Sequence, residues 1–295
     1  MRHIDHIVVA VHDLDRAADF HRRLGFQVGP RNHHPWGTEN RLIQFGSSFI
    51  ELITLGSSPH RIPPHQPRRF SFGAFVRNYL EQREGIAMLV LSSADATSDA
   101  ARFAAQAIGG FEPFPFERKA NKPDGSETQV AFTLAFASDP AAPHAGFFVC
   151  QQHYPENFWN RSFQQHANSA TNISAVTLTS SDPKQHADFL TKFTGAEGKY
   201  LSDRHLEFVL DGGRLEVVSA IETRMPFLAS PLLTSFSVRV AETSTVTRVL
   251  SAERIPFTTS NGGIVLAPAT CFGVELRFES NAAASGPAYQ ESSPL

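Results

Sequence analysis

The pattern of hydrophobic and polar positions divides the first 55 residues into one helix and several strands. Residues 4–11 (IDHIVVAV) are rich in β-branched side chains and end at a polar pair, which is typical of a buried strand. Asp13 is placed to cap a helix of amphipathic period, and Gly25 is placed to end it. Three extended segments follow, at residues 26–28, 41–45 and 48–55. The predicted order is therefore βαβββ.

The same order recurs three more times along the chain. In the second unit the strands fall at residues 86–91, 127–137 and 146–151, and the helix at 95–108. In the third the strands fall at 173–179, 205–210 and 214–218, with a helix from 182 to 195. In the fourth the strands fall at 234–240, 264–267 and 274–278, with a helix at 242–253. The sequence thus predicts an α+β fold of four βαβββ modules in tandem.

The boundaries between these units predict the domain organisation. Modules 1 and 2 occupy residues 1–153, and modules 3 and 4 occupy residues 172–280. Residues 154–171 are expected to link the two halves, and residues 281–295 have the composition of a disordered tail.

Composition and charge narrow the kinds of partner. The net charge of −3 and a pI near 6.5 give no sign of a nucleic-acid surface. No apolar run is long enough to span a membrane, and the first residues do not read as a signal peptide. The two cysteines, Cys150 and Cys271, are 121 residues apart and are expected to be reduced thiols in a cytoplasmic protein. The expected partner is a small molecule.

Histidine is concentrated in the first half: 11 of the 13 histidines precede residue 170. The sequence contains no GxGxxG, GxxxxGK[ST], HExxH or GxSxG motif, which closes several large enzyme classes. Chemistry that uses imidazole is therefore expected in the N-terminal half.

His6 and Glu51 are the first candidate pair. Alternation along a strand puts Ile4, His6, Val8 and Ala10 on one face, and it puts Phe49, Glu51 and Ile53 on one face of the fourth strand. A neutral imidazole and a carboxylate suit a divalent metal such as Zn²⁺, Mn²⁺, Ni²⁺ or Fe²⁺. The alternative is structural, in which Glu51 accepts a hydrogen bond from His6 or from an arginine.

A third ligand is needed for a catalytic metal. Gln152, Cys150, His153 and His34 are the candidates. Gln152 shares a strand face with Cys150, whereas His153 points the opposite way unless the strand bends. The alternative role for His153 is a capping residue beside the linker.

Two segments offer substrate contacts. In the loop 33–40, His34 is a candidate acid or base and Trp36 a candidate wall of a pocket, and the alternative is an ordered connection whose Thr38 and Asn40 satisfy backbone groups. In the segment 68–78, Phe72 and Arg77 are candidates for an apolar wall and a cationic rim, and the alternative is core packing. Residues 117–125 read as a solvated hairpin tip or a lid.

The four modules, the Ile4-Asp5-His6-Ile7 strand and the Phe49-Ile50-Glu51-Leu52 strand resemble the vicinal-oxygen-chelate superfamily, in its glyoxalase-like branch. The resemblance implies that modules pair into two curled mixed-sheet halves, each a cup whose first and fourth strands hold a metal. His6 and Glu51 match those ligand positions. Met88 and Cys150 depart from the pattern in module 2. Module 3 has Ala175 in the histidine position and module 4 has no opening histidine, although Glu216 and Glu275 remain, so modules 3 and 4 are expected to be a degenerate copy.

The resemblance implies a metal-dependent lyase or isomerase of a small, oxygenated, carbonyl-bearing substrate, with Glu51, His34 or His153 moving the proton. One alternative is an Fe(II) dioxygenase, which needs two histidines and a carboxylate. Another is a drug-sequestering binding protein without metal. The cup closes within one chain or across a homodimer.

Overall fold

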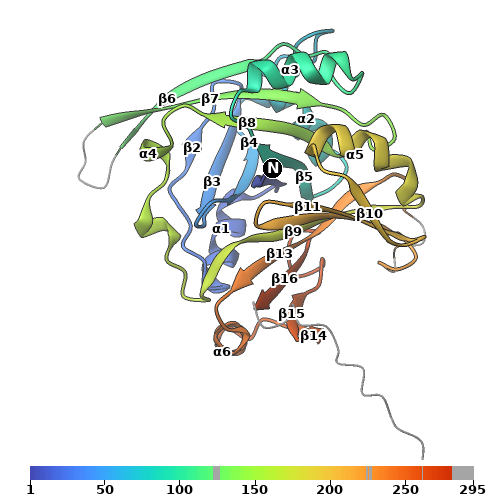
Figure 1. The fold of residues 1–295 in the computed structure, drawn as a ribbon. Helices are drawn as coiled ribbons and strands as arrows, with labels where there is room; N and C mark the ends of the chain where they lie inside the picture. Colours follow the sequence, from blue (N-terminus) through green and yellow to red (C-terminus); the bar gives the residue numbers. More distant parts are fainter. Residues whose placement is uncertain (122–126, 224, 226–227, 261, 281–295) are drawn as a thin grey trace, which may run out of the picture.

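The computed structural model describes residues 1–121, 127–223, 225, 228–260 and 262–280 of the chain. Its helices and strands follow one another as four βαβββ modules (Figure 1). The predicted α+β fold class is thereby confirmed.

Module 1 builds one wall of the first half. Its elements are β1 (Ile4–Ala10), α1 (Leu14–Arg23), β2 (Asn32–His33), β3 (Thr38–Gln44) and β4 (Phe49–Leu55). The side chain of Asp13 accepts hydrogen bonds from the backbone N–H groups of Asp15 and Arg16, which caps α1 as the sequence predicts. β1 runs parallel to β4, and β4 and β3 are antiparallel.

Module 2 repeats this arrangement and pairs with module 1 through the first strands. A short turn η1 (Pro59–Arg61) and the helix α2 (Phe72–Leu80) connect the two modules. Module 2 consists of β5 (Gly85–Ser92), α3 (Ala96–Ala105), β6 (Phe114–Asn121), β7 (Glu127–Ala137) and β8 (Gly146–Gln152). Because β1 and β5 are antiparallel neighbours, the strand order of the first half is β6-β7-β8-β5-β1-β4-β3-β2.

The second half has the same strand order. It follows α4 (Pro155–Phe158) and η2 (Arg161–Gln164). Its elements are β9 (Ala170–Ser180), η3 (Pro183–His186), α5 (Ala187–Thr194), β10 (Gly198–Ser202), β11 (His205–Leu210), β12 (Gly213–Ser219), β13 (Leu232–Val240), α6 (Thr243–Ala252), β14 (Thr258–Ser260), β15 (Gly263–Leu266) and β16 (Glu275–Ser280). β9 and β13 pair antiparallel, as β1 and β5 do.

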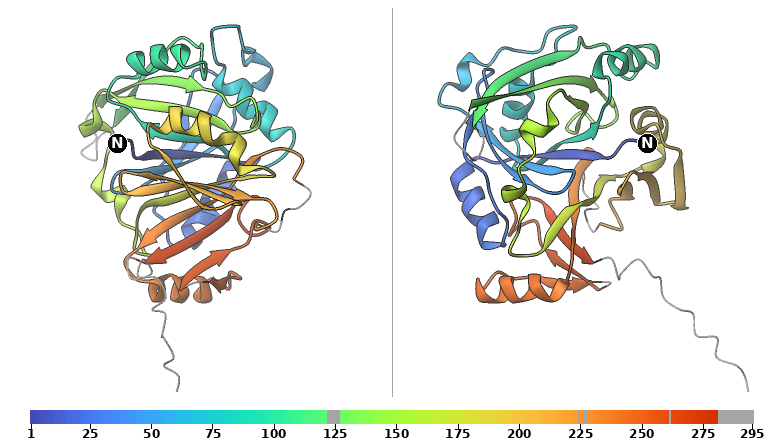
Figure 2. Two further views of the ribbon diagram at one scale, coloured as in Figure 1. Left: turned by 45° about the vertical axis from the view of Figure 1, so that its right-hand side comes forward. Right: turned by 60° about the vertical axis from the view of Figure 1, so that its left-hand side comes forward.

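The two halves meet where β13 pairs with β5 at Leu233 and Ile86. Figure 2 shows α3 and α6 at opposite ends of the molecule, with the sheets between them. A buried polar contact also joins the halves: Nδ1 of His186 lies 2.6 Å from Oδ2 of Asp139, and Nε2 of His186 lies 2.9 Å from the Ser180 hydroxyl.

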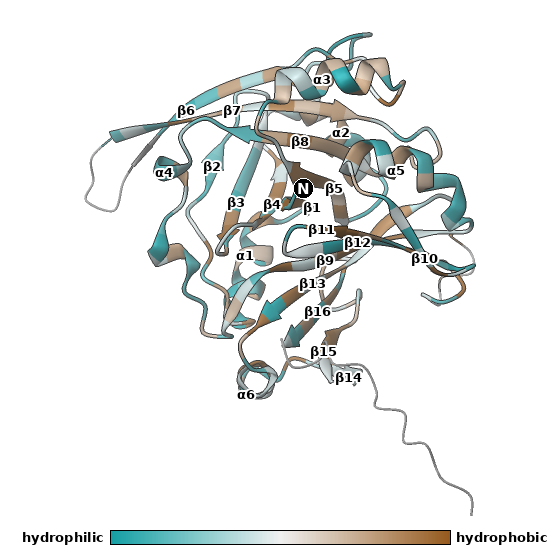
Figure 3. Ribbon diagram, in the orientation of Figure 1, coloured by the Kyte–Doolittle hydropathy of each residue, from teal (hydrophilic) through white to brown (hydrophobic). Residues whose placement is uncertain are grey.

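Two hydrophobic clusters occupy the faces of the first sheet. One contains the outward face of β1, including Ile7 and Val9, and continues into the second half. The other contains Val8 and Ala10 of β1 and fills the concave face of the first half. The central strand β5 is brown in Figure 3 and β2 is teal, as expected for buried and peripheral strands.

The structure differs from the sequence-based expectation at four places. Residues 72–80 form the helix α2, for which the sequence gives no expectation, and residues 114–121 form the strand β6, where a solvated tip or a lid is expected from residue 117 onward. The second strand of module 1 lies at residues 32–33 and not at 26–28. The expected tail 281–295 and residues 122–126 of the expected lid lie outside the described residues.

The fourth difference is a bulge in β1. The register between β1 and β5 shifts between Ile4 and His6, so Ile4 joins the outward cluster instead of sharing a face with His6. Alternation resumes after the bulge, because Val8 and Ala10 face the concave side as predicted.

None of the helices in the described part of the chain has the length and apolar content that crossing a bilayer requires.

The contact between Asp139 and His186 generates a stability prediction. Asp139→Ala should lower the free energy of unfolding by about 3 kcal/mol, because it leaves the fully buried His186 ring without its carboxylate. Denaturant unfolding followed by circular dichroism measures the loss. Asp203→Ala, which breaks an exposed pair with Lys184 in the same region of module 3, is the control and should leave the midpoint unchanged. Equal effects of the two substitutions would contradict the prediction.

Candidate active site

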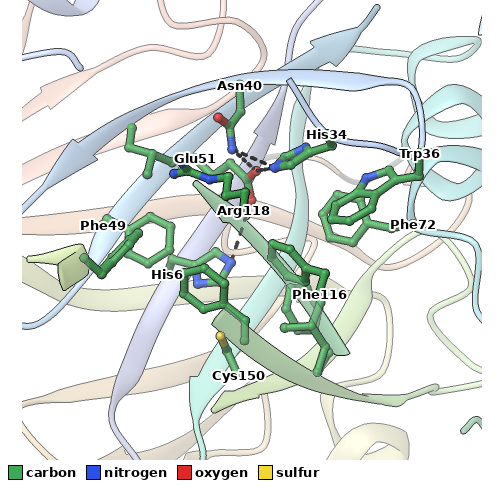
Figure 4. A pocket seen from close by; sticks show the side chains of 15 residues that line it. His6, His34, Trp36, Asn40, Phe49, Glu51, Phe72, Phe116, Arg118 and Cys150 are labelled. Carbon is green, nitrogen blue, oxygen red and sulfur yellow. Dashed lines mark hydrogen bonds and ion pairs between the residues drawn. The ribbon is translucent and has the colours of Figure 1, made fainter. Parts of the chain in front are cut away.

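A cavity of about 50 Å³ opens on the concave face of the first half, between β1, β3, β4, β6, β7, β8, the start of α2 and the end of α4. Its walls are mostly aromatic and its polar groups are few (Figure 4). It is lined by His6, His34, Trp36, Asn40, Leu42, Phe49, Glu51, Phe72, Phe116, Arg118, Phe132, Leu134, Phe148, Cys150 and Phe158.

His6 is held in one orientation by its neighbours. The bulge in β1 lets Asp5 and His6 contact each other, and Nδ1 of His6 lies 2.6 Å from Oδ1 of Asp5. The His6 ring stacks on Phe49 with centroids 4.2 Å apart. Asp5 also accepts a hydrogen bond from Nε2 of Gln152 at 2.9 Å. Because the ionised carboxylate of Asp5 is an acceptor, Nδ1 carries a proton and Nε2 faces the cavity.

Glu51 lies opposite Val8 in the parallel pair of β1 and β4, so its side chain enters the same cup as His6. The carboxylate is buried: Glu51 is 6% exposed. It accepts a hydrogen bond from Nδ2 of Asn40, and its two oxygens each lie 3.8 Å from Nε2 of a histidine, Oε2 from His6 and Oε1 from His34. Glu51 is therefore the group on which the polar side chains of the cavity converge.

His34 is positioned by the hairpin between β2 and β3. The turn requires Gly37, whose φ is +89° and where a Cβ would approach Ile62 to 2.9 Å. The ring of His34 stacks on Trp36 with centroids 4.5 Å apart. Nδ1 lies 2.9 Å from the Thr38 hydroxyl and Nε2 lies 3.2 Å from Nδ2 of Asn40. Since an amide nitrogen can only donate, Nε2 of His34 is unprotonated.

Burial shifts the titration of two groups in the cavity. The pKa of His34 is lowered, first because burial disfavours the imidazolium and further by the positive charge of Arg118, while Glu51 opposes the shift. The pKa of Cys150 is raised well above its usual value, chiefly by burial and further by the negative charges of Asp5 and Glu51. The cavity therefore contains a neutral His34 and a protonated Cys150 near neutral pH.

Of the residues expected from the sequence, the structure brings together in the cavity His6, Glu51, His34, Cys150, Trp36 and Phe72. Three other candidates do not line the cavity. Gln152 lies behind Asp5 and contacts it rather than Glu51. His153 is exposed on the opposite side of β8, where its Nε2 contacts the Thr133 hydroxyl at 2.8 Å.

Arg77 is the third candidate outside the cavity. It is half-buried on α2 and contacts the neighbouring Asn78. In a helix, residues 72 and 77 lie on different faces, so only Phe72 reaches the cup. Arg77 therefore lies outside the cavity that Phe72 lines, and a substrate contact by Arg77 stays a prediction.

Sequence reasoning missed Asp5 and Arg118 and gave Asn40 a backbone role. Arg118 is on β6, in the part of the chain where the sequence predicts a solvated tip or a lid. The signal that indicates this strand is alternation: Phe114, Phe116 and Arg118 stand at every second position, and the residues between them are exposed. No such signal exists for Asp5, because only the bulge turns it toward His6.

Strand register identifies the counterparts of the two candidate ligands in the other modules. In module 2, Met88 occupies the position of His6, and Phe148, rather than Cys150, occupies that of Glu51. In module 3 these positions hold Ala175 and Glu216. Glu216 is paired with Arg214 at 3.2 Å, and Arg214 also contacts Glu279.

The donor atoms of the cavity suit a divalent metal, because two unprotonated imidazole nitrogens face one carboxylate and a second carboxylate orients His6. In the present arrangement of side chains, no group of three or more His, Cys, Asp and Glu residues in the described ranges is placed to hold an ion. The amide of Asn40 lies between His34 and Glu51. His6 and Glu51 are thus the two donors that face each other without an intervening side chain in Figure 4.

Comparison with known proteins gives a family match and several structural neighbours. Residues 4–194 match the family described as a glyoxalase-like domain. No curated protein matches the sequence. A hypothetical protein from Staphylococcus aureus has a similar structure, with a TM-score of 0.68 and 14% identity, covering 95% of this chain and 100% of that one.

Two structural neighbours have named activities. A mutant 4-hydroxymandelate synthase from Streptomyces coelicolor aligns with a TM-score of 0.62 and 12% identity, over 96% of this chain and 93% of that one. An Mn(II)-bound glyoxalase from Novosphingobium aromaticivorans aligns with a TM-score of 0.56 and 10% identity, over 94% of this chain and 81% of that one. At these identities the likeness shows a shared fold.

The lowered pKa of His34 generates a prediction on pH. The unfolded chain takes up a proton at the ordinary histidine pKa of 6.5, whereas folded His34 does not, so its contribution to stability is lost as pH falls below that value. Between about pH 7 and about pH 5, His34→Gln should lose less free energy of unfolding than the wild type. Denaturant unfolding at each pH measures the difference. His33→Gln, an exposed neighbour in the same hairpin, is the control and should behave as the wild type.

Proposed function

The chain belongs to the glyoxalase-like domain family, and from that premise we propose that it is a metal-dependent lyase or isomerase of a small, carbonyl-bearing substrate. The observation that carries the proposal is the facing pair of His6 and Glu51 on the floor of a mostly apolar cavity. The divalent metal in the structurally similar Mn(II)-bound glyoxalase supports the proposal of a metal site.

The charges around the cavity favour a bound cation. Asp5 is 2% exposed and Glu51 is 6% exposed, so two carboxylates are withdrawn from water. Arg118 lines the same cavity but forms no ion pair with either of them within 4 Å. Burying uncompensated charge is costly, and a divalent ion held by His6 and Glu51 would balance it. Such an ion supplies Lewis acidity to neighbouring substrate oxygens.

The residues of the chain then have separate tasks. Asp5 keeps Nε2 of His6 directed at the cavity, and Asn40 fixes the Glu51 carboxylate. Nε2 of His34 is the proton acceptor, because Thr38 and Asn40 hold that nitrogen unprotonated and its lowered pKa keeps it neutral. In an isomerisation, this nitrogen takes a proton from a carbon beside the substrate carbonyl and returns it at the adjacent carbon, so no proton is gained or lost overall.

The aromatic walls exclude water from this transfer. Phe49, Phe148 and Phe72 surround the His6 ring and the cavity behind it. A dry cavity strengthens the electrostatic interactions between the substrate and the polar floor.

A second candidate is an iron-dependent dioxygenase. It needs two histidines and one carboxylate, and the observation that favours it is that His34, rather than His153, shares the cavity with His6 and Glu51. Oxygen consumption by the Fe(II)-loaded protein would distinguish this function from a lyase or isomerase. A metal-free binding protein is the remaining alternative, favoured by the lack of a three-residue metal group among the described residues.

The metal proposal predicts the metal content of three variants. Wild-type protein loaded with Zn²⁺, Mn²⁺, Ni²⁺ or anaerobic Fe²⁺ and then desalted should retain about one equivalent per chain. His6→Ala and Glu51→Gln should each lose most of it and remain folded, because a missing ligand weakens metal binding more than it weakens the core. Elemental analysis and thermal melting measure the two effects.

Glu216→Gln is the matched control, since Glu216 has the same strand position in module 3 but is paired with Arg214. Its metal content should equal that of the wild type. If the wild type retains no metal, and His6→Ala and Glu51→Gln both melt early, then the pair is structural and the metal-free binding function replaces the proposal.

A further inference from the structure

Arg118 stands apart from the other polar groups of the cavity. It lies on β6, on the wall opposite the His6 floor, and Figure 4 shows its side chain beside Glu51. Arg118 is half-buried, and burial lowers its pKa, which the negative charge of Glu51 partly offsets.

The polar groups around Arg118 already have partners. Asp5 contacts His6, Asn40 contacts Glu51, and His34 contacts Thr38. The half-buried arginines Arg41 and Arg214 pair with carboxylates. Within the described chain, by contrast, Arg118 has neither a hydrogen bond nor an ion pair within 4 Å, although it lines a mostly apolar cavity. A guanidinium in such a place is matched by the anion of a ligand, for which its planar donors are suited.

The surroundings of Arg118 define the rest of that ligand. Phe116 shares the inward face of β6 with Arg118 and stacks on Phe132 with centroids 5.0 Å apart. Phe148 closes the cavity beside His6. These flat, apolar walls suit an aromatic ring. A cavity that binds benzene measures about 150 Å³, so a cavity of about 50 Å³ must widen to admit the ring.

We propose that the ligand of this cavity is a small aromatic carboxylate whose carboxylate group pairs with Arg118. This rests on the proposed function, since it names the substrate class of the same site. With an ion held by His6 and Glu51, the charges of the ion (+2), Arg118 (+1), Asp5 (−1) and Glu51 (−1) sum to +1, which one carboxylate neutralises. Arg118 thus selects the substrate by its carboxylate, while His6 and Glu51 hold the ion.

The test uses benzoate and its uncharged counterpart benzamide as probes, with binding measured by titration calorimetry on the full chain. Wild-type protein should bind benzoate at least about tenfold more tightly than benzamide, because a charged hydrogen-bonded pair distinguishes them. Arg118→Gln should bind the two probes equally. Arg118→Lys keeps the charge without the planar fork and should show an intermediate preference.

Arg77→Gln is the matched control, an arginine of the same half that lies outside the cavity, and it should keep the wild-type preference. Circular dichroism verifies that each variant is folded. If Arg118→Gln does not fold, the comparison between wild type and Arg118→Lys decides. Equal affinities in the wild type, a preference that survives in Arg118→Gln, or no binding of either probe would overturn the proposal.

The measurements are made on chelator-treated protein and on metal-loaded protein, which separates this inference from the proposed function. A benzoate preference that depends on Arg118 in protein that retains no metal would support the inference while the metal-dependent function fails. Retained metal without any benzoate preference would support the metal-dependent function and overturn the inference about Arg118.

Discussion

The burial of the Glu51 carboxylate is the constraint around which the first half is arranged. A carboxylate among phenylalanine rings is stable only when donors and positive charge surround it. Asn40 supplies a hydrogen bond, whereas the unprotonated Nε2 atoms of His6 and His34 lie 3.8 Å from the two oxygens and donate none, which leaves the carboxylate short of positive charge. Each of these groups needs its own support, from Asp5 for His6 and from Thr38 for His34. The hairpin before β3 positions His34, and the bulge in β1 brings Asp5 into contact with His6.

The sequence predicts most of the fold and the two residues at the centre of the site. Alternation is a strong signal in a short, buried strand, and it places both His6 and Glu51 on the concave face. It also places His153 on the opposite side of β8 from the cavity. The order of the modules can be predicted because the same pattern of strands and helices occurs four times. One occurrence alone would be weak evidence for a βαβββ module.

The remaining features depend on tertiary structure. A bulge shifts one residue against a neighbouring strand and leaves no mark in a single sequence, so the contact between Asp5 and His6 could not be predicted. The spacing of the aromatic residues at 70, 72 and 75, with Gly73 among them, concealed the helix α2. The charged residues 117–119 concealed the strand β6, because half of that strand faces solvent and only Arg118 of the three faces the cavity.

The comparison of β6 with β1 bears on how a ligand enters. β1 is hydrogen-bonded on both sides, to β4 and β5, whereas β6 pairs in the described chain with β7 alone. Separation of an edge strand breaks one ladder, and separation of a central strand breaks two, so amide hydrogen exchange is expected to be faster in β6. The residues that recognise the ligand, Phe116 and Arg118, therefore belong to the wall that opens at the lower free-energy cost. A ligand that entered by separation of β6 from its neighbour would leave the central strand of His6, and with it the arrangement of the reactive groups, undisturbed.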